Sequence, residues 1–166
     1  GKLMLFLAIR EQIDTLKENP MRKFAIFISS LVFLASTWSL AESHVQVNLL
    51  SSQDEVKAGE PFELGIHLVM KDHWHTYWEN PGSSGLATEI DWELPAGLEV
   101  QPLQFPIAKK FVDEAGYVTY GYDNEALLVA KAIYKGTENE ITLKGKVHWL
   151  ECKQMCLPGS QDVELK

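Results

Sequence analysis

The two cysteines of this chain lie four positions apart near its end, as Cys152 and Cys156, and no other cysteine is present among its 166 residues. A disulfide between them would close a very short ring, which the loop-entropy view of disulfides credits with little global stabilisation. A bridge that stabilises little is more typical of labile, regulatory or catalytic sites than of architectural ones. The spacing therefore indicates thiol–disulfide chemistry or a soft-metal site. Cys152 and Cys156 are the predicted catalytic pair.

Three kinds of chemistry fit such a pair. In a redox dithiol, one thiolate attacks a partner's disulfide and the other cysteine resolves the mixed disulfide. In a copper(I)-binding protein, the two thiolates would need a further ligand such as the imidazole of His148 or His73. In a purely structural domain, the bridge would be incidental. We rank the redox interpretation first, and it requires neither a cofactor nor a metal.

An aromatic segment, His73–Gly85, is the second candidate feature; it contains Trp74, Tyr77 and Trp78 and ends in a Gly/Ser-rich turn. As a loop it could cover a reactive cysteine pair or offer a docking platform, but such rings more often fill one end of a core. His73 and His75 could point the same way on an extended segment and bind copper. A solvated or hydrogen-bonded pair is the commoner outcome.

The start of the chain predicts export. A short basic stretch, Met21–Lys23, precedes an apolar run from Phe24 to Leu34, and Ser39-Leu40-Ala41 offers small residues for cleavage. We expect an upstream extension at 1–20, a helical signal peptide at 21–41 and one mature domain at 42–166, with an uncleaved membrane anchor as the alternative. The exported domain would lie in the periplasm, where a cysteine pair can cycle between dithiol and disulfide.

The composition of the mature segment narrows its partners. Residues 42–166 contain ten lysines, no arginine and twenty acidic residues, a formal charge of −10. Nucleic acids and anionic lipids both require clustered cations, so neither is expected as a partner. The segment has no Gly-rich phosphate loop and no serine-nucleophile motif, which leaves nucleotide-dependent and hydrolase functions without support.

The elements that must position the cysteines are predicted to be strands. Alternating apolar residues mark strands at Val45–Leu49, Phe62–Met70, Leu127–Ile133 and Ile141–Trp149, with shorter candidates at Glu89–Trp92, Leu98–Leu103, Tyr117–Tyr122 and Asp162–Leu165. Turns are expected at 58–61, 80–82, 95–97 and 135–137. Short strands without helical periodicity favour an all-β, antiparallel, immunoglobulin-like β-sandwich. The cysteines would then lie in a loop or hairpin, without the helix N-terminus that lowers a thiol pKa in thioredoxin-type sites. In that setting Lys153 would favour the thiolate and Glu151 would oppose it.

Several motifs together resemble one protein family. They are Trp74-His75-Thr76-Tyr77-Trp78 with Asn80-Pro81-Gly82 and Ser84-Gly85, then Ile90–Gly97, Phe105-Pro106, Gly121-Tyr122, and Trp149–Cys152 with Cys156-Leu157-Pro158. Over residues 44–166 the chain is similar to the amino-terminal periplasmic domain of DsbD-type transmembrane protein-disulfide reductases, including their copper-tolerance branch.

The resemblance implies an immunoglobulin-like fold, and it implies protein-disulfide reductase activity of the whole protein. Electrons would come from a membrane-embedded donor of the same polypeptide and pass to periplasmic thioredoxin-like proteins, such as those of cytochrome c biogenesis, or disulfide isomerases. Cys152 and Cys156 match the family's redox pair by position. The best-known branch separates its cysteines by more residues than the three found here. The chain also stops at Lys166, so we expect either a truncated product or a free-standing domain with a separate reductant.

Overall fold

The structure is a computed structural model that describes residues 42–166. The expected extension at 1–20 and the helical signal peptide at 21–41 lie outside the described residues. Within the described part, no helix is long and apolar enough to cross a membrane.

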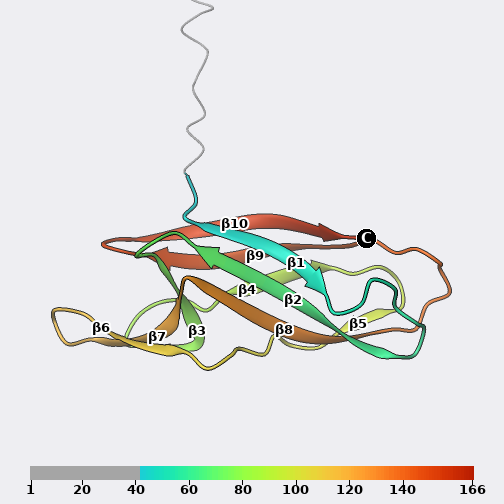
Figure 1. Cartoon of the computed structure of the whole chain (residues 1–166), viewed down its shortest axis with the longest axis horizontal. Coiled ribbons are helices and arrows are strands. Elements are labelled where there is room, and N and C mark those ends of the chain that lie inside the picture. The colour runs from blue at the N-terminus through green and yellow to red at the C-terminus, as the bar shows by residue number, and fades with distance from the viewer. Residues whose placement is uncertain (1–41) are drawn as a thin grey trace, which may run out of the picture. The chain divides into compact units, whose positions relative to one another are not determined.

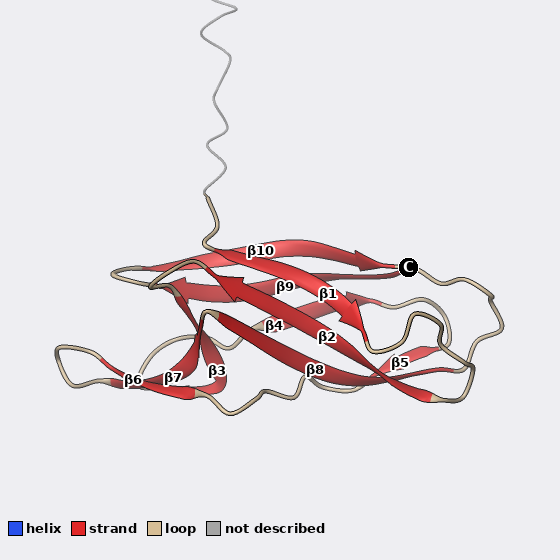
Figure 2. Ribbon diagram, in the orientation of Figure 1, coloured by secondary structure: helices blue, strands red, loops and turns tan. Residues whose placement is uncertain are grey.

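Ten strands build the described domain, and loops connect them (Figure 2). They are β1 (Val45–Ser51), β2 (Pro61–Met70), β3 (His75–Gly82), β4 (Glu89–Glu93), β5 (Leu98–Val100), β6 (Lys109–Val112), β7 (Val118–Asp123), β8 (Glu125–Tyr134), β9 (Leu143–Cys152) and β10 (Cys156–Leu165).

The strands form two antiparallel sheets (Figure 1). One is four-stranded in the order β1-β2-β8-β5; the other is six-stranded, with the path β10-β9-β3-β7-β6 and β4 added beside β9. At the seam between the sheets, the Gln161 side chain of β10 hydrogen-bonds both the N–H and the C=O of Val47 on β1. The prediction of an all-β, antiparallel, immunoglobulin-like sandwich is confirmed.

Alternation along the strands decides what the two sheets bury. Five apolar side chains of β2 point inward, from Phe62 to Met70 at every second position, as the sequence predicts. On β8 the predicted face is wrong, because Leu127 is exposed while the even-numbered residues from Ala126 to Tyr134 are buried. Three of those even-numbered residues are alanines, whose short side chains suit a position between two closely packed sheets.

Several boundaries also differ from the sequence-based expectation. β3 and β6 were not predicted as strands, and β10 is longer than the short final strand expected at Asp162–Leu165. Asn80–Gly82 is not a separate turn, because it forms the irregular end of β3, where the pairing with β7 shifts register. Aromatic and β-branched residues, which favour strands, outweigh the turn residues in this segment.

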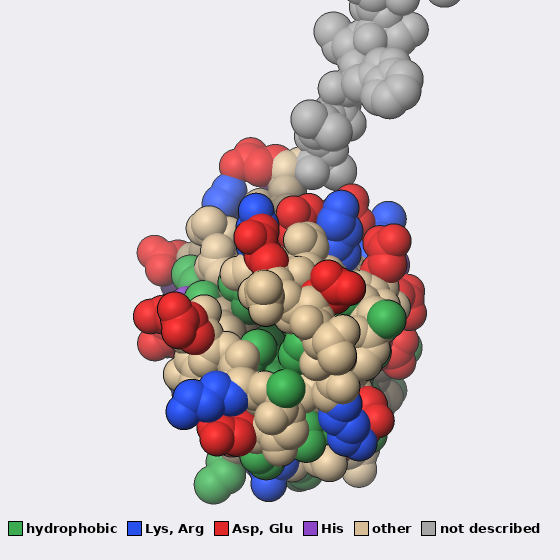
Figure 3. Space-filling model, turned by 90° about the vertical axis from the view of Figure 1, so that its right-hand side faces the viewer, with side chains coloured by type: hydrophobic (Ala, Val, Ile, Leu, Met, Phe, Trp, Pro, Cys, Tyr) green, Lys and Arg blue, Asp and Glu red, His purple; other side chains and the backbone are tan. Residues whose placement is uncertain are grey.

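The two ends of the sandwich differ in character. The tip of the β9–β10 hairpin lies at one end, and the C-terminal end of β10 lies at the other (Figure 1). At the C-terminal end, apolar side chains that include Leu49, Leu64 and Leu143 line a cavity of about 350 Å³. Figure 3 shows hydrophobic side chains at the bottom of a hollow on this face. The cysteines therefore lie at the opposite end of the domain from this hollow.

Candidate functional site

Cys152 and Cys156 form a disulfide across the tip of the β9–β10 hairpin. Cys152 is the last residue of β9 and Cys156 the first of β10, and the two are direct partners in the antiparallel register. Their Cα atoms are 4.1 Å apart, which brings the two side chains to the same face of the hairpin. The hairpin register thus places the sulfurs in bonding distance, and only Lys153, Gln154 and Met155 lie between them.

The two cysteine residues differ in their exposure to solvent. Cys152 is 3% exposed, because β9 has β10 on one side and β3 on the other, with His75 directly opposite Cys152. Cys156 is exposed, because β10 is the edge strand of the six-stranded sheet. Attack on a disulfide requires access to the sulfur that is attacked. An incoming thiolate therefore reaches Cys156 far more easily than Cys152.

Tyr77 of β3 contacts both sulfurs from the buried side. Its hydroxyl donates a hydrogen bond to Sγ of Cys152 at 3.1 Å and lies 3.7 Å from Sγ of Cys156. The side chain is 3% exposed, and burial raises the pKa of Tyr77. The hydroxyl therefore stays protonated at neutral pH and acts as a fixed donor aimed at the sulfurs.

The loop after β3 covers the Tyr77 ring. Gly85 in this loop has a φ of +112°, and a Cβ placed on it would lie 2.3 Å from the nearest ring carbon of Tyr77. Only glycine fits such an approach. Trp74 stacks on His44 and Trp78 meets Tyr120 edge-on, so these two indoles pack within the fold, whereas the Tyr77 hydroxyl reaches the sulfurs.

His75 lies beside the disulfide. Its ring stacks on Phe111, with centroids 5.0 Å apart, and meets the edge of Tyr77 at 5.3 Å. Burial lowers the pKa of His75, while the nearby carboxylate of Asp123 acts in the opposite direction. The imidazole is therefore neutral at neutral pH.

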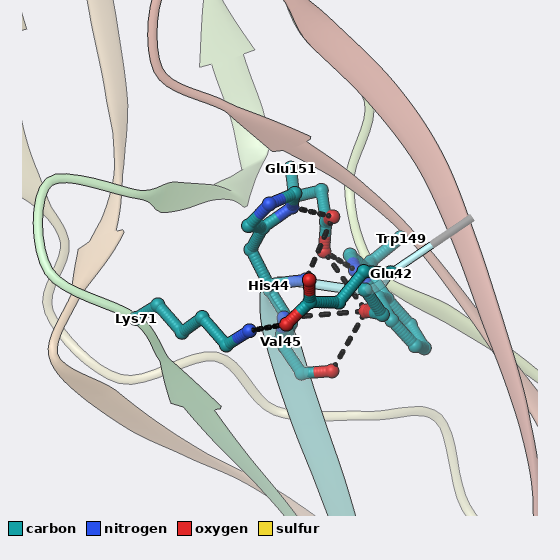
Figure 4. Close-up of polar contacts among 7 residues, drawn as sticks. Glu42, His44, Val45, Lys71, Trp149 and Glu151 are labelled. Carbon is teal, nitrogen blue, oxygen red and sulfur yellow. Dashed lines mark hydrogen bonds and ion pairs between the residues drawn. The ribbon is translucent and has the colours of Figure 1, made fainter. Parts of the chain in front are cut away.

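On the inner side of β9, the carboxylate of Glu151 is buried at 2% exposure and accepts four hydrogen bonds (Figure 4). They come from Trp149 Nε1 at 2.9 Å, His44 N–H at 3.0 Å, His44 Nδ1 at 2.9 Å and Ser43 Oγ at 3.2 Å. Burial raises the pKa of Glu151, but these bonds outweigh it and hold the pKa below its usual value. The Glu151 carboxylate thus links the segment before β1 to β9, directly before Cys152.

Of the histidines considered as copper ligands, only His75 lies beside the cysteines. His148 pairs with Asp91 at 3.1 Å, and the exposed His73 occupies a left-handed turn with φ of 68°. Across residues 42–166, no group of three or more His, Cys, Asp or Glu side chains is arranged to hold a metal ion. The Tyr77 hydroxyl and the His75 imidazole therefore lie beside the cysteine pair.

Two features of the site escaped the sequence reasoning. Tyr77 is one of several aromatic residues in its segment. What sets it apart is its contact with the sulfurs, which results from the pairing of β3 with β9. Glu151 was read as a local charge beside Cys152, whereas its carboxylate is buried on the other face of β9. The alternation of Val147, Trp149 and Glu151 along the inward face was the available signal for this burial.

Residues 46–166 match the family described as "Thiol:disulfide interchange protein DsbD, N-terminal", and the chain belongs to this family. Family membership and the Cys152–Cys156 disulfide together support thiol–disulfide exchange as the class of chemistry.

Two solved structures are similar to this chain. The N-terminal periplasmic domain of ScsB from Proteus mirabilis superposes with a TM-score of 0.58 at 24% identity, covering 75% of this chain and 47% of that chain. This chain therefore spans about half the length of that relative. The reduced N-terminal domain of DsbD from Neisseria meningitidis gives a TM-score of 0.47 at 15% identity, covering 72% and 83%. No curated protein matches the chain.

Proposed function

We propose that residues 42–166 form a periplasmic thiol–disulfide exchange domain that carries electron pairs on Cys152 and Cys156. The observation that carries this proposal is the hairpin disulfide between one buried and one exposed cysteine. A membrane-associated reductant would supply the electrons, and thioredoxin-like proteins or disulfide isomerases of the periplasm would receive them.

The proposed cycle uses the two sulfurs in different roles. In the reduced domain, the thiolate of Cys156 attacks a partner disulfide, forms a mixed disulfide and releases one partner thiolate. Cys152 then attacks Sγ of Cys156, which releases the second partner thiolate and restores the hairpin disulfide. The partner gains two electrons and the domain loses two. Recharging runs in reverse, with Cys152 as the leaving group.

Tyr77 acts at the leaving sulfur in this scheme. When an incoming thiolate breaks the hairpin disulfide at Cys156, negative charge develops on Cys152, 3.1 Å from the Tyr77 hydroxyl. A hydrogen bond to a charged acceptor is about twice as strong as one to a neutral acceptor. The hydroxyl therefore stabilises the separated state more than the bonded one.

Single-cysteine variants test the proposal. Cys152→Ser leaves the exposed Cys156. This variant should form a mixed disulfide with a thioredoxin-like protein whose reactive cysteine has first been joined to an aromatic thiol. Cys156→Ser leaves the buried Cys152, and it should react at least tenfold more slowly. Thermal unfolding should be close to that of the reduced wild-type domain in both. Equal reactivity of the two variants, or a disulfide that thiols reduce only after the domain unfolds, would contradict the proposed roles.

A further inference from the structure

A row of three side chains crosses the outer face of the six-stranded sheet at the level of the disulfide. Cys152 on β9 is directly opposite His75 on β3, and His75 is directly opposite Asp123 on β7. Directly opposed residues share a face and have Cβ atoms about 4.5–5.5 Å apart. The Tyr77 hydrogen bond to Cys152 fixes the face, since Tyr77 is two residues from His75 on the same strand. The register thus aligns a thiol, an imidazole and a carboxylate.

The surroundings suit the imidazole to accept a proton. The charged and titratable groups that face it are Cys152 from β9, Tyr77 from its own strand and Asp123 from β7. Behind Asp123, Lys109 of β6 forms an ion pair with that carboxylate. The lowered pKa of His75 leaves the ring neutral near pH 7, so a ring nitrogen has a lone pair available.

One step of the proposed cycle needs such a base. After Cys156 has formed a mixed disulfide, Cys152 must lose its thiol proton before it can attack. An ordinary thiol has a pKa of about 8.5 and is mostly protonated at neutral pH. Cys152 is shielded from water, and the Tyr77 hydroxyl beside it is itself protonated and serves as a donor.

We infer that His75 is the general base of ring closure, a role that rests on the proposed exchange function. Its imidazole accepts the proton of the Cys152 thiol, and the new thiolate attacks Sγ of Cys156. The S–S bond to the partner breaks, and the partner sulfur leaves with the electron pair. The imidazolium then returns its proton to the departing thiolate or to water. In recharging the steps run in reverse: the neutral imidazole takes the proton of the attacking partner thiol, and the imidazolium formed in this way protonates Cys152 as it leaves.

A chromogenic aromatic disulfide separates the two steps on the intact chain. The reduced protein should release one equivalent of coloured thiolate when Cys156 attacks and a second equivalent when Cys152 closes the ring. General-base catalysis contributes about 10²–10⁴-fold. We expect His75→Gln to slow the second release by about 10²-fold at neutral pH. The first release should change by less than about threefold, because His75 acts after it.

The pH profile distinguishes a base from a packing residue. The second release in the wild type should be nearly flat between the pKa of His75 and that of the thiol. In His75→Gln it should rise about tenfold per pH unit towards the thiol pKa of about 8.5. His148→Gln is the matched control, since His148 lies on β9, pairs with Asp91 and is half exposed. It should leave both releases unchanged.

The outcomes are separable. A His75→Gln second release with wild-type rate and profile would overturn the role of His75 while leaving the exchange function supported. A wild-type second release that rises tenfold per pH unit from about pH 6 to 8.5 would overturn it as well, even if the variant did not fold. Absence of any second release from the wild type would instead refute the proposed function.

Discussion

The hydroxyl of Tyr77 offers the sharpest test of how this hairpin handles electrons. Tyr77→Phe deletes one oxygen atom and keeps the ring that fills the space under Gly85. The lost interaction is the 3.1 Å hydrogen bond to Cys152 and the 3.7 Å approach to Cys156. Sulfur in a disulfide is a weak acceptor, whereas a thiolate is a charged one. The substitution should therefore affect the bond-breaking step more than the stability of the oxidised domain.

The expected size follows from this difference. Hydrogen bonds to charged groups contribute about 1.5–3 kcal/mol, and neutral ones about 0.5–1.5 kcal/mol. The loss specific to the developing thiolate is then about 1–2 kcal/mol, a factor of about 5–30 in rate. The oxidised domain should lose less than about 1 kcal/mol of stability, because no strong hydrogen-bond partner is left buried and unpaired.

The assay is reduction of the oxidised domain by a small dithiol, with stability followed by thermal unfolding. Tyr122→Phe is the matched control, since Tyr122 is also buried and its hydroxyl donates to the carbonyl of Pro106 at 2.8 Å, away from the sulfurs. It should lower stability by about 1 kcal/mol and leave the reduction rate unchanged. If Tyr77→Phe is reduced as fast as the wild type, or if both variants slow equally, the hydroxyl has no specific role at the leaving sulfur.

Three further predictions concern the supports of the site. Glu151→Ala should lower stability by about 3 kcal/mol in thermal unfolding, since it leaves several buried donors unpaired. The control Glu164→Ala, at an exposed ion pair, should lower stability by less than about 0.5 kcal/mol. Equal losses would show that the buried network contributes nothing. Folding lowers the pKa of Glu151, so the stability that its charged form contributes is present above the unfolded pKa of about 4.3 and is lost as pH falls through the folded pKa. The difference in stability between the wild type and Glu151→Gln should therefore shrink on acidification. A difference that stays constant from about pH 6 to 3 would contradict this. Gly85→Ala should displace the Tyr77 ring, move its hydroxyl away from Cys152 and slow reduction of the disulfide by thiols. Gly116→Ala, at a φ of +85° with nothing within 4 Å, should cost about 1 kcal/mol without changing that rate; similar rates in both variants would mean that the loop does not hold the Tyr77 hydroxyl in place.

The sequence predicted the architecture because period-two alternation is strong wherever a strand has one buried face. The five inward residues of β2 and the apolar face of β9 were read correctly for this reason. On β8 both faces carry apolar residues, so alternation alone could not decide between the leucine–valine face and the alanine face. The face with the small side chains is the buried one. Lys131 on the opposite face was the residue that indicated this.

The site was only partly predictable, because its chemistry depends on pairing between distant strands. The cysteine spacing predicted a short local ring but left a soft-metal site open, and the hairpin register brings the two sulfurs into a disulfide. The contact of Tyr77 with Cys152 joins residues 75 positions apart, and the bonds from His44 to Glu151 span 107. Local patterns carry no information about which strands pair or in which register. The aromatic segment was therefore recognised as a candidate, but no role could be given to a particular ring.

The scaffold explains why access, rather than a strongly lowered pKa, would govern exchange here. Thioredoxin-type sites place a cysteine at a helix N-terminus, where the helix dipole favours the thiolate. The described domain has no helix, so no helix dipole favours a thiolate at either cysteine. A neutral donor from Tyr77 replaces only part of that effect. Cys152 therefore becomes reactive only while a proton acceptor is at hand, and Cys156 on the edge strand is the sulfur that a partner can reach. The two sulfurs thus have different roles because β9 is interior to its sheet and β10 is at its edge.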